Sequence, residues 1–125
     1  MAEKESEANL MKKIRIALSE ANCLVFRANV GRAWQGDEVL HVGESIVLNG
    51  QPRPFSTGLP TGFSDIFGST PQGIFFAVEV KTGRRKPTEE QENFIEQVRS
   101  RGGRAGVARS VADALKIVQG GTDHE

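Results

Sequence analysis

Residues 62–83 read GFSDIFGSTPQGIFFAVEVKTG, and the fold prediction starts from this stretch. Within it, Ile74–Lys81 (IFFAVEVK) is the strongest strand candidate of the chain, because it is rich in β-branched and aromatic residues. Phe63–Phe67 predicts a shorter strand just before it. Side chains alternate between the two faces of a strand, so Glu79 and Lys81 share one face, whereas the opposite face is entirely apolar.

Acidic and basic side chains stand where these strands should be apolar. Asp65 lies between Phe63 and Phe67 on its own face, and a carboxylate in such a place is costly unless it is paired or bound to a cation. An alternative is that Asp65 caps backbone amides at a turn. For Glu79 and Lys81 the alternative is an ion pair on a solvated face.

Two further polar residues interrupt apolar helix stripes. Glu7 continues the apolar stripe of a helix predicted over Glu5–Ala21, and Gln91 shares the apolar stripe of a helix predicted over Thr88–Arg101. Each has an ordinary alternative. The helix dipole favours an acid near the N-terminus, and Gln91 could complete a capping box with Thr88.

The remaining elements complete an α/β order. Strands are predicted at Cys23–Asn29 and Arg104–Arg109, and a last helix at Ser110–Gln119. Glu38–Val42 and Ser45–Leu48 flank a glycine-containing turn and predict a hairpin. A strand–helix–strand crossover near the end favours a parallel strand pair. We therefore expect an α/β fold with a mixed central sheet flanked by helices.

Composition limits the class of protein. With 125 residues the chain is predicted to form a single domain, 1–125. Sixteen basic and sixteen acidic side chains balance, which excludes a strongly basic nucleic-acid binder but not a local basic patch. Cys23 is the only cysteine, so no disulfide framework is expected. The charged N-terminus does not resemble a secretory signal, and the apolar runs are too short for a membrane span.

Taken together, the residue types of Asp65, Glu79 and Lys81 indicate a particular kind of reaction at a bound metal ion. Two neighbouring carboxylates repel each other unless a proton or a cation lies between them. Mg²⁺ takes one or two protein carboxylates and leaves its other positions to water and phosphate oxygens. A lysine beside it can orient a water or stabilise charge on a phosphate. This composition is typical of phosphodiester hydrolysis.

The same residues resemble a known family. Asp65, thirteen further residues and then Glu79-Val80-Lys81 resemble the PD-(D/E)xK nuclease signature, with Ser64 in place of the proline. The motifs GFSDIFG, VEVKTG, Thr88-x-x-Gln91 and GGRAGVARS together look like its VRR-NUC branch. The segment Phe26–Arg32 is similar to small stand-alone members from phages and bacteria, for which a cytoplasmic location is expected.

The resemblance implies a restriction-endonuclease-like core of order α-β-β-β-α-β, here with an extra hairpin and a C-terminal helix. It also implies a DNA endonuclease that depends on Mg²⁺ or Mn²⁺. The implied metal ligands are Asp65, Glu79, the Val80 carbonyl and Glu7. The implied catalytic side chains are Asp65, Glu79, Lys81, Gln91 and Glu7.

Basic residues predict where DNA would bind. The expected phosphate contacts are Arg27, Arg32, Arg84, Arg85 and Lys86, although a basic run after a strand can also be a solvated loop. By analogy with Holliday junction resolvases we expect branched DNA as the substrate and a homodimer as the active form. The alternatives are a catalytically silent nuclease-like module that binds branched DNA or a protein partner, and a structural α/β domain with surface ion pairs.

Overall fold

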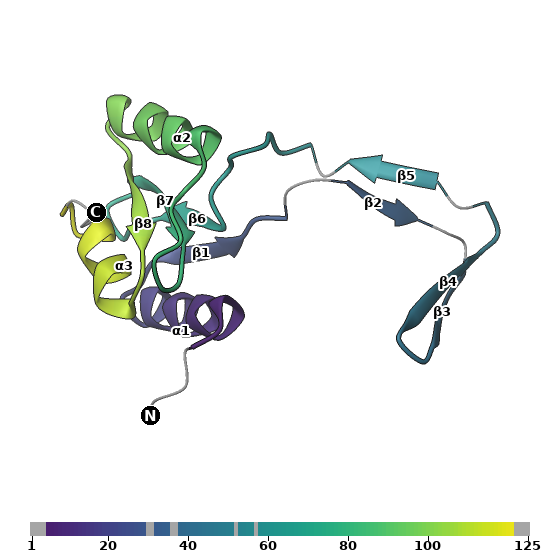
Figure 1. Cartoon of the computed structure of the whole chain (residues 1–125). Coiled ribbons are helices and arrows are strands. Elements are labelled where there is room, and N and C mark those ends of the chain that lie inside the picture. Colours follow the sequence, from purple (N-terminus) through teal and green to yellow (C-terminus); the bar gives the residue numbers. More distant parts are fainter. Residues whose placement is uncertain (1–4, 30–31, 36–37, 52, 57, 122–125) are drawn as a thin grey trace. The chain divides into compact units, whose positions relative to one another are not determined.

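The computed structural model describes residues 5–29, 32–35, 38–51, 53–56 and 58–121. The chain divides into two compact units, one made of Met1–Ala28 with Thr61–Glu125 and the other of Asn29–Pro60. The first unit contains the sheet and the helices on which the predictions above depend (Figure 1).

The first unit is built on a mixed sheet of four strands in the order β1-β6-β7-β8. These are β1 (Leu24–Arg27), β6 (Ile66–Ser69), β7 (Phe75–Val80) and β8 (Arg104–Ala108). β6 pairs antiparallel with both β1 and β7, whereas β7 and β8 are parallel. The helix α2 (Glu89–Ser100) connects the parallel pair, so the predicted crossover and the mixed sheet are confirmed.

Helices cover both faces of this sheet. In Figure 1, α2 lies on one side, and α1 (Glu7–Glu20) and α3 (Val111–Val118) lie on the other. The strand β7 contributes to both cores, because its side chains alternate. Phe76, Val78 and Val80 pack with residues of α1 and α3, whereas Ala77 packs with Ile95 and Val98 of α2. A strand that buries one face needs apolar residues at alternate positions alone. In β7 both faces are buried.

The helix ends follow local sequence chemistry. Ser6 caps α1 by accepting a hydrogen bond from the Asn9 amide at 3.1 Å. Thr88 and Gln91 form the predicted capping box of α2. Ser110 caps α3, but the Asp113 carboxylate accepts from the Arg109 amide at 2.9 Å and thus reaches one residue further upstream than a capping box requires.

The strand predicted at Phe63–Phe67 begins later, at Ile66, and this boundary was wrong. The physical reason is the loss of ladder partners: the amide of Val80 bonds to the side chain of Asp65 rather than to a backbone carbonyl. The predicted face is nevertheless confirmed, because the Phe63 and Phe67 rings meet edge to face with centroids 5.3 Å apart.

The second unit contains two separate two-stranded sheets. The predicted hairpin is confirmed as β3 (Glu38–Val42) paired antiparallel with β4 (Ser45–Asn49). The sequence predictions did not include the other pair, β2 (Arg32–Gln35) with β5 (Arg53–Ser56). Among the described parts of the chain, no helix is long and apolar enough to cross a membrane.

Candidate active site

The β6–β7 hairpin places Asp65 opposite Glu79. Its register pairs Ser69 with Phe75 and, at the far end, Ile66 with Val78. One further step along the same register brings Asp65 and Glu79 face to face. Residues directly opposite each other in an antiparallel pair have their side chains in contact range. The spacing of the two acids therefore follows from the hairpin.

Asp65 is held by the neighbouring strand. Its Oδ2 accepts a hydrogen bond from the Val80 amide at 2.9 Å. Asp65 therefore binds a backbone amide, but the alternative of a cap at a local turn was wrong, because the amide belongs to the neighbouring strand β7. The N–H and C=O groups of one strand residue point to the same edge, so the Val80 carbonyl is directed to the side of the strand on which Asp65 lies.

Glu79 is a buried carboxyl group, with 2% of its surface exposed. Its Oε1 accepts a hydrogen bond from Gln91 Nε2 at 3.2 Å, while its Oε2 is buried without a donor among the described residues. The pKa of Glu79 is raised to about 9, mainly by burial and then by a hydrogen bond to Asp65 and by the charges of Asp65 and Glu7, against the opposing charge of Lys81. Two adjacent carboxyl groups can hydrogen-bond only when one of them carries a proton.

Lys81 is also buried, with 6% of its surface exposed. Its charge lowers the pKa of Glu79, so the two groups lie within electrostatic reach of each other. The alternative of an ion pair on a solvated face was therefore wrong for Glu79 and Lys81. The reason is that α2 covers this face of β7, which the strand pattern alone could not indicate.

Gln91 forms the predicted capping box and also contacts Glu79. Its Oε1 accepts from the Thr88 amide at 2.8 Å and completes the helix cap. The Nε2 group at the other end of the same amide donates to Glu79. The cap thereby fixes the orientation of a side chain that contacts the candidate site.

Glu7 lies near the site but is paired elsewhere. It is the first residue of α1, and its Oε2 is 2.5 Å from Nη1 of Arg85. Within the ranges that the structure describes, no three Asp, Glu, His or Cys side chains are close enough to hold one metal ion together. Asp65 and Glu79 are thus brought together without Glu7 as a third carboxylate.

The predicted basic residues occupy exposed positions where their side chains are described. These are Arg27, Arg84, Arg85 and Lys86. The side chain of Arg32 lies outside the described part of the chain. Sequence reasoning did not single out Arg109, whose Nη1 donates to the Gly83 carbonyl at 3.2 Å and so contacts the basic loop. The signal available was its position directly after β8, since parallel strands end at the same edge of a sheet.

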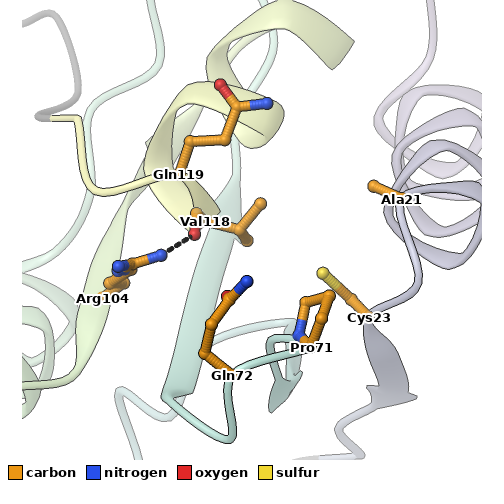
Figure 2. A pocket seen from close by; sticks show the side chains of 7 residues that line it. All are labelled: Ala21, Cys23, Pro71, Gln72, Arg104, Val118 and Gln119. Atoms are coloured by element: carbon orange, nitrogen blue, oxygen red, sulfur yellow. Dashed lines mark hydrogen bonds between the residues drawn. The ribbon is translucent and has the colours of Figure 1, made fainter.

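A separate pocket of about 350 Å³ lies at the other end of β7 (Figure 2). It is lined by Cys23, by the turn residues Pro71 and Gln72 that precede β7, and by residues at the ends of the helices. Arg104 lies beside it and donates to the Val118 carbonyl, as Figure 2 shows. Because Lys81 follows the opposite end of the strand, this pocket is not part of the candidate site.

The donor set fits a divalent cation. Asp65 and Glu79 provide two opposed carboxyl groups, and Oε2 of Glu79 is buried with no hydrogen-bond donor in the part of the chain that the structure describes. A cation would compensate the charge of the buried Glu79 and its repulsion by Asp65, which otherwise keep a proton on Glu79. Two carboxylates and one backbone carbonyl match the oxygen ligands and the ligand number that Mg²⁺ takes from a protein.

Comparisons with known proteins identify the family and the fold of this chain. The family model of the VRR-NUC domain matches residues 7–112. A solved structure described as a VRR_NUC domain is 20% identical and has a TM-score of 0.58, over 91% of this chain and 95% of that chain. That likeness confirms the predicted fold. None of the curated proteins matches the chain. This chain therefore belongs to the VRR-NUC family of nuclease domains.

Proposed function

We propose that this nuclease domain is a DNA endonuclease that depends on Mg²⁺ or Mn²⁺ and cuts branched DNA such as Holliday junctions. The observation that carries the proposal is the buried Glu79 directly opposite the partly buried Asp65, with the buried Lys81 beside them. A buried carboxyl group directly opposite a second carboxylate is unfavourable in a merely structural domain, since it is either forced to keep a proton or repelled by its neighbour. The strain is explained if the pair holds a cation.

The residues of the chain would divide the chemistry as follows. Asp65, Glu79 and the Val80 carbonyl would hold the cation, which when bound lowers the pKa of a water ligand and polarises a phosphoryl oxygen. Lys81 supplies a positive charge that stabilises the negative charge developing on the phosphate. Gln91 keeps the Glu79 carboxylate in a fixed orientation through its amide.

Exposed basic side chains support DNA as the substrate. Arg84, Arg85 and Lys86 lie three to five residues after Lys81, so the phosphate backbone would lie across the loop beside the carboxylate pair. Cutting two strands of a junction in step needs two active sites. The chain contributes one such site, and a homodimer with twofold symmetry would supply the second.

The proposal is tested by incubating the purified chain with labelled four-way junctions, flaps, forks and linear duplexes, with each divalent metal and with a chelator. We expect cutting of branched forms with Mg²⁺ or Mn²⁺ and none with the chelator. Asp65→Asn, Glu79→Gln and Lys81→Met should each lower the cleavage rate by about 100-fold or more. Light scattering at the assay concentration measures the oligomeric state.

Matched controls come from α1, away from the carboxylate pair. Glu20→Gln and Lys12→Met change exposed side chains of the same types and should leave the cleavage rate unchanged. Cutting that persists in the chelator, or full activity of Lys81→Met, would overturn the assigned roles. Tight junction binding without hydrolysis under any metal would favour the silent binding module instead.

A further inference from the structure

We propose that Arg85 is a positioning residue that withholds Glu7 from the metal site until a DNA phosphate binds its guanidinium group. The proposal rests on the proposed function and adds a coupling between DNA and metal to it. It starts from one ion pair, between residues 78 positions apart in the chain.

The contact joins two parts of the molecule that both border the site. Glu7 begins α1, and Arg85 lies in the loop between β7 and α2. Their side chains meet with Arg85 Nη1 at 2.5 Å from Glu7 Oε2. Glu7 is close enough to Glu79 for its charge to act on that carboxyl group. Glu7 is therefore within electrostatic reach of the site while its own carboxylate is occupied by a guanidinium.

The ion pair is open to competition. The side chain of Arg85 is 62% exposed and that of Glu7 27% exposed, so burial does not hold the pair together. Exposed ion pairs contribute little stability, and a stronger partner can replace either member. For Arg85 that partner is a phosphate, which a guanidinium binds through two hydrogen bonds. For Glu7 it is a divalent cation.

The two exchanges are linked. When a phosphate takes Arg85, Glu7 loses its counter-charge, and the negative charge available to a cation beside Asp65 and Glu79 increases. Linkage requires the reverse as well, so a bound cation that attracts Glu7 frees Arg85 for DNA. DNA and metal therefore bind cooperatively, and Arg85 carries the coupling.

The test measures Mn²⁺ affinity by calorimetry and by electron paramagnetic resonance, without DNA. Arg85→Gln should bind Mn²⁺ about fivefold more tightly than the unaltered chain, the lower end of ordinary coupling factors. Arg84→Gln is the matched control, because it removes the same charge from the next position of the same loop. It should change the affinity much less. Arg85→Lys, which retains the charge, should return most of the unaltered affinity.

A second set of variants isolates Glu7. In a Glu7→Gln background, Arg85→Gln should no longer tighten Mn²⁺ binding. DNA is then added in a Lys81→Met background, in which the proposed function predicts cleavage slowed by about 100-fold or more. DNA should raise Mn²⁺ affinity there, and the addition of Arg85→Gln should reduce this gain.

The outcomes separate this proposal from the proposed function. Equal tightening by Arg84→Gln and Arg85→Gln, or no tightening by Arg85→Gln, would overturn the role of Arg85 alone. A gain that survives in Glu7→Gln would do the same. Mn²⁺ binding that is absent, or that persists in Glu79→Gln, would overturn the metal site and this proposal with it.

Discussion

At the scale of single residues, the opposed carboxyl groups of Asp65 and Glu79 lead to two expectations, cation binding and a response of stability to pH. Like charges directly opposite each other in a strand pair are destabilising. Because Glu79 is buried beneath α2, water cannot stabilise its charge, and Glu79 keeps its proton to an unusually high pH. A cation offers the other way to relieve the repulsion. The same geometry thus predicts how the metal-free protein responds to pH.

Stability of the metal-free protein should fall as pH rises between about 4.5 and about 9, the ordinary and the raised pKa of Glu79. In this range the unfolded chain has lost the proton that the folded protein still holds, so each pH step favours unfolding. Glu79→Gln removes the group, and its melting temperature should depend less on pH across this range. Thermal melts at several pH values in a chelator measure it.

The control for this prediction is Glu20→Gln, which changes an exposed carboxylate of α1 and should retain the slope of the unaltered chain. A Glu79→Gln slope equal to that of the unaltered chain would contradict the raised pKa. Metal binding should also release protons below about pH 9, which calorimetry in buffers of different ionisation enthalpy detects.

Gln91→Glu should lower the free energy of unfolding by about 1–3 kcal/mol, the usual cost of leaving a buried acceptor without its donor. The new carboxylate keeps an oxygen for the Thr88 amide but places no N–H group against Glu79. Urea unfolding of the metal-free protein measures the change. Gln97→Glu, the same substitution at an exposed position of α2, should be close to neutral. Equal stability of both variants would argue against the Gln91–Glu79 contact.

At the scale of elements, a close contact between one glycine and α2 fixes the path of the chain segment that leads to Asp65. Gly62 has a φ of +93°, and a Cβ atom there would lie 2.6 Å from the Glu90 carbonyl oxygen. This contact brings the segment that leads to Asp65 against the first turn of α2, the turn from which Gln91 reaches Glu79. The position needs glycine both for its backbone angle and for space.

Gly62→Ala should therefore destabilise the protein by more than Gly73→Ala. Gly73 also has a positive φ, of +83°, but a Cβ atom there would meet nothing within 4 Å. Gly73→Ala should cost about 1 kcal/mol for the backbone angle alone, and Gly62→Ala should add the cost of displacing α2. Urea unfolding compares them. Equal losses would show that α2 moves away freely.

At the scale of the whole molecule, every residue of the two cores belongs to the unit made of Met1–Ala28 and Thr61–Glu125. One core lies between the sheet and α1 with α3, and the other lies beneath α2. The sheet of this unit is continuous, and within the described residues its four strands pair with one another alone. This unit thus holds both the candidate site and the packing that supports it.

Replacing residues 29–60 with a ten-residue Gly/Ser linker should leave the first unit folded. The Ala28 amide bonds to the Asp65 carbonyl at 2.8 Å, and residues 61–65 span at most about 14 Å, well within the linker's extended reach of about 33 Å. The shorter connection should change the free energy of unfolding by about 1 kcal/mol. Circular dichroism and urea unfolding measure this, and loss of cooperative unfolding would contradict it.

The elements and the acid pair could be predicted from the sequence because they depend on local chemistry. Thr88 and Ser110 cap helices at their predicted starts, and Ser6 caps α1 one residue after the predicted start at Glu5, since a cap needs only neighbours in the chain. Asp65 and Glu79 are equally far from Gln72, so a hairpin centred there brings them opposite each other.

Only the tertiary structure decided which environment these residues meet. It buried Glu79 and Lys81 under α2, began β6 at Ile66, and paired Glu7 with an arginine from a distant loop. The helix that covers a strand face, and the side chain that meets a partner far along the chain, depend on how separate elements pack. That packing is non-local, so no pattern within one segment contains it.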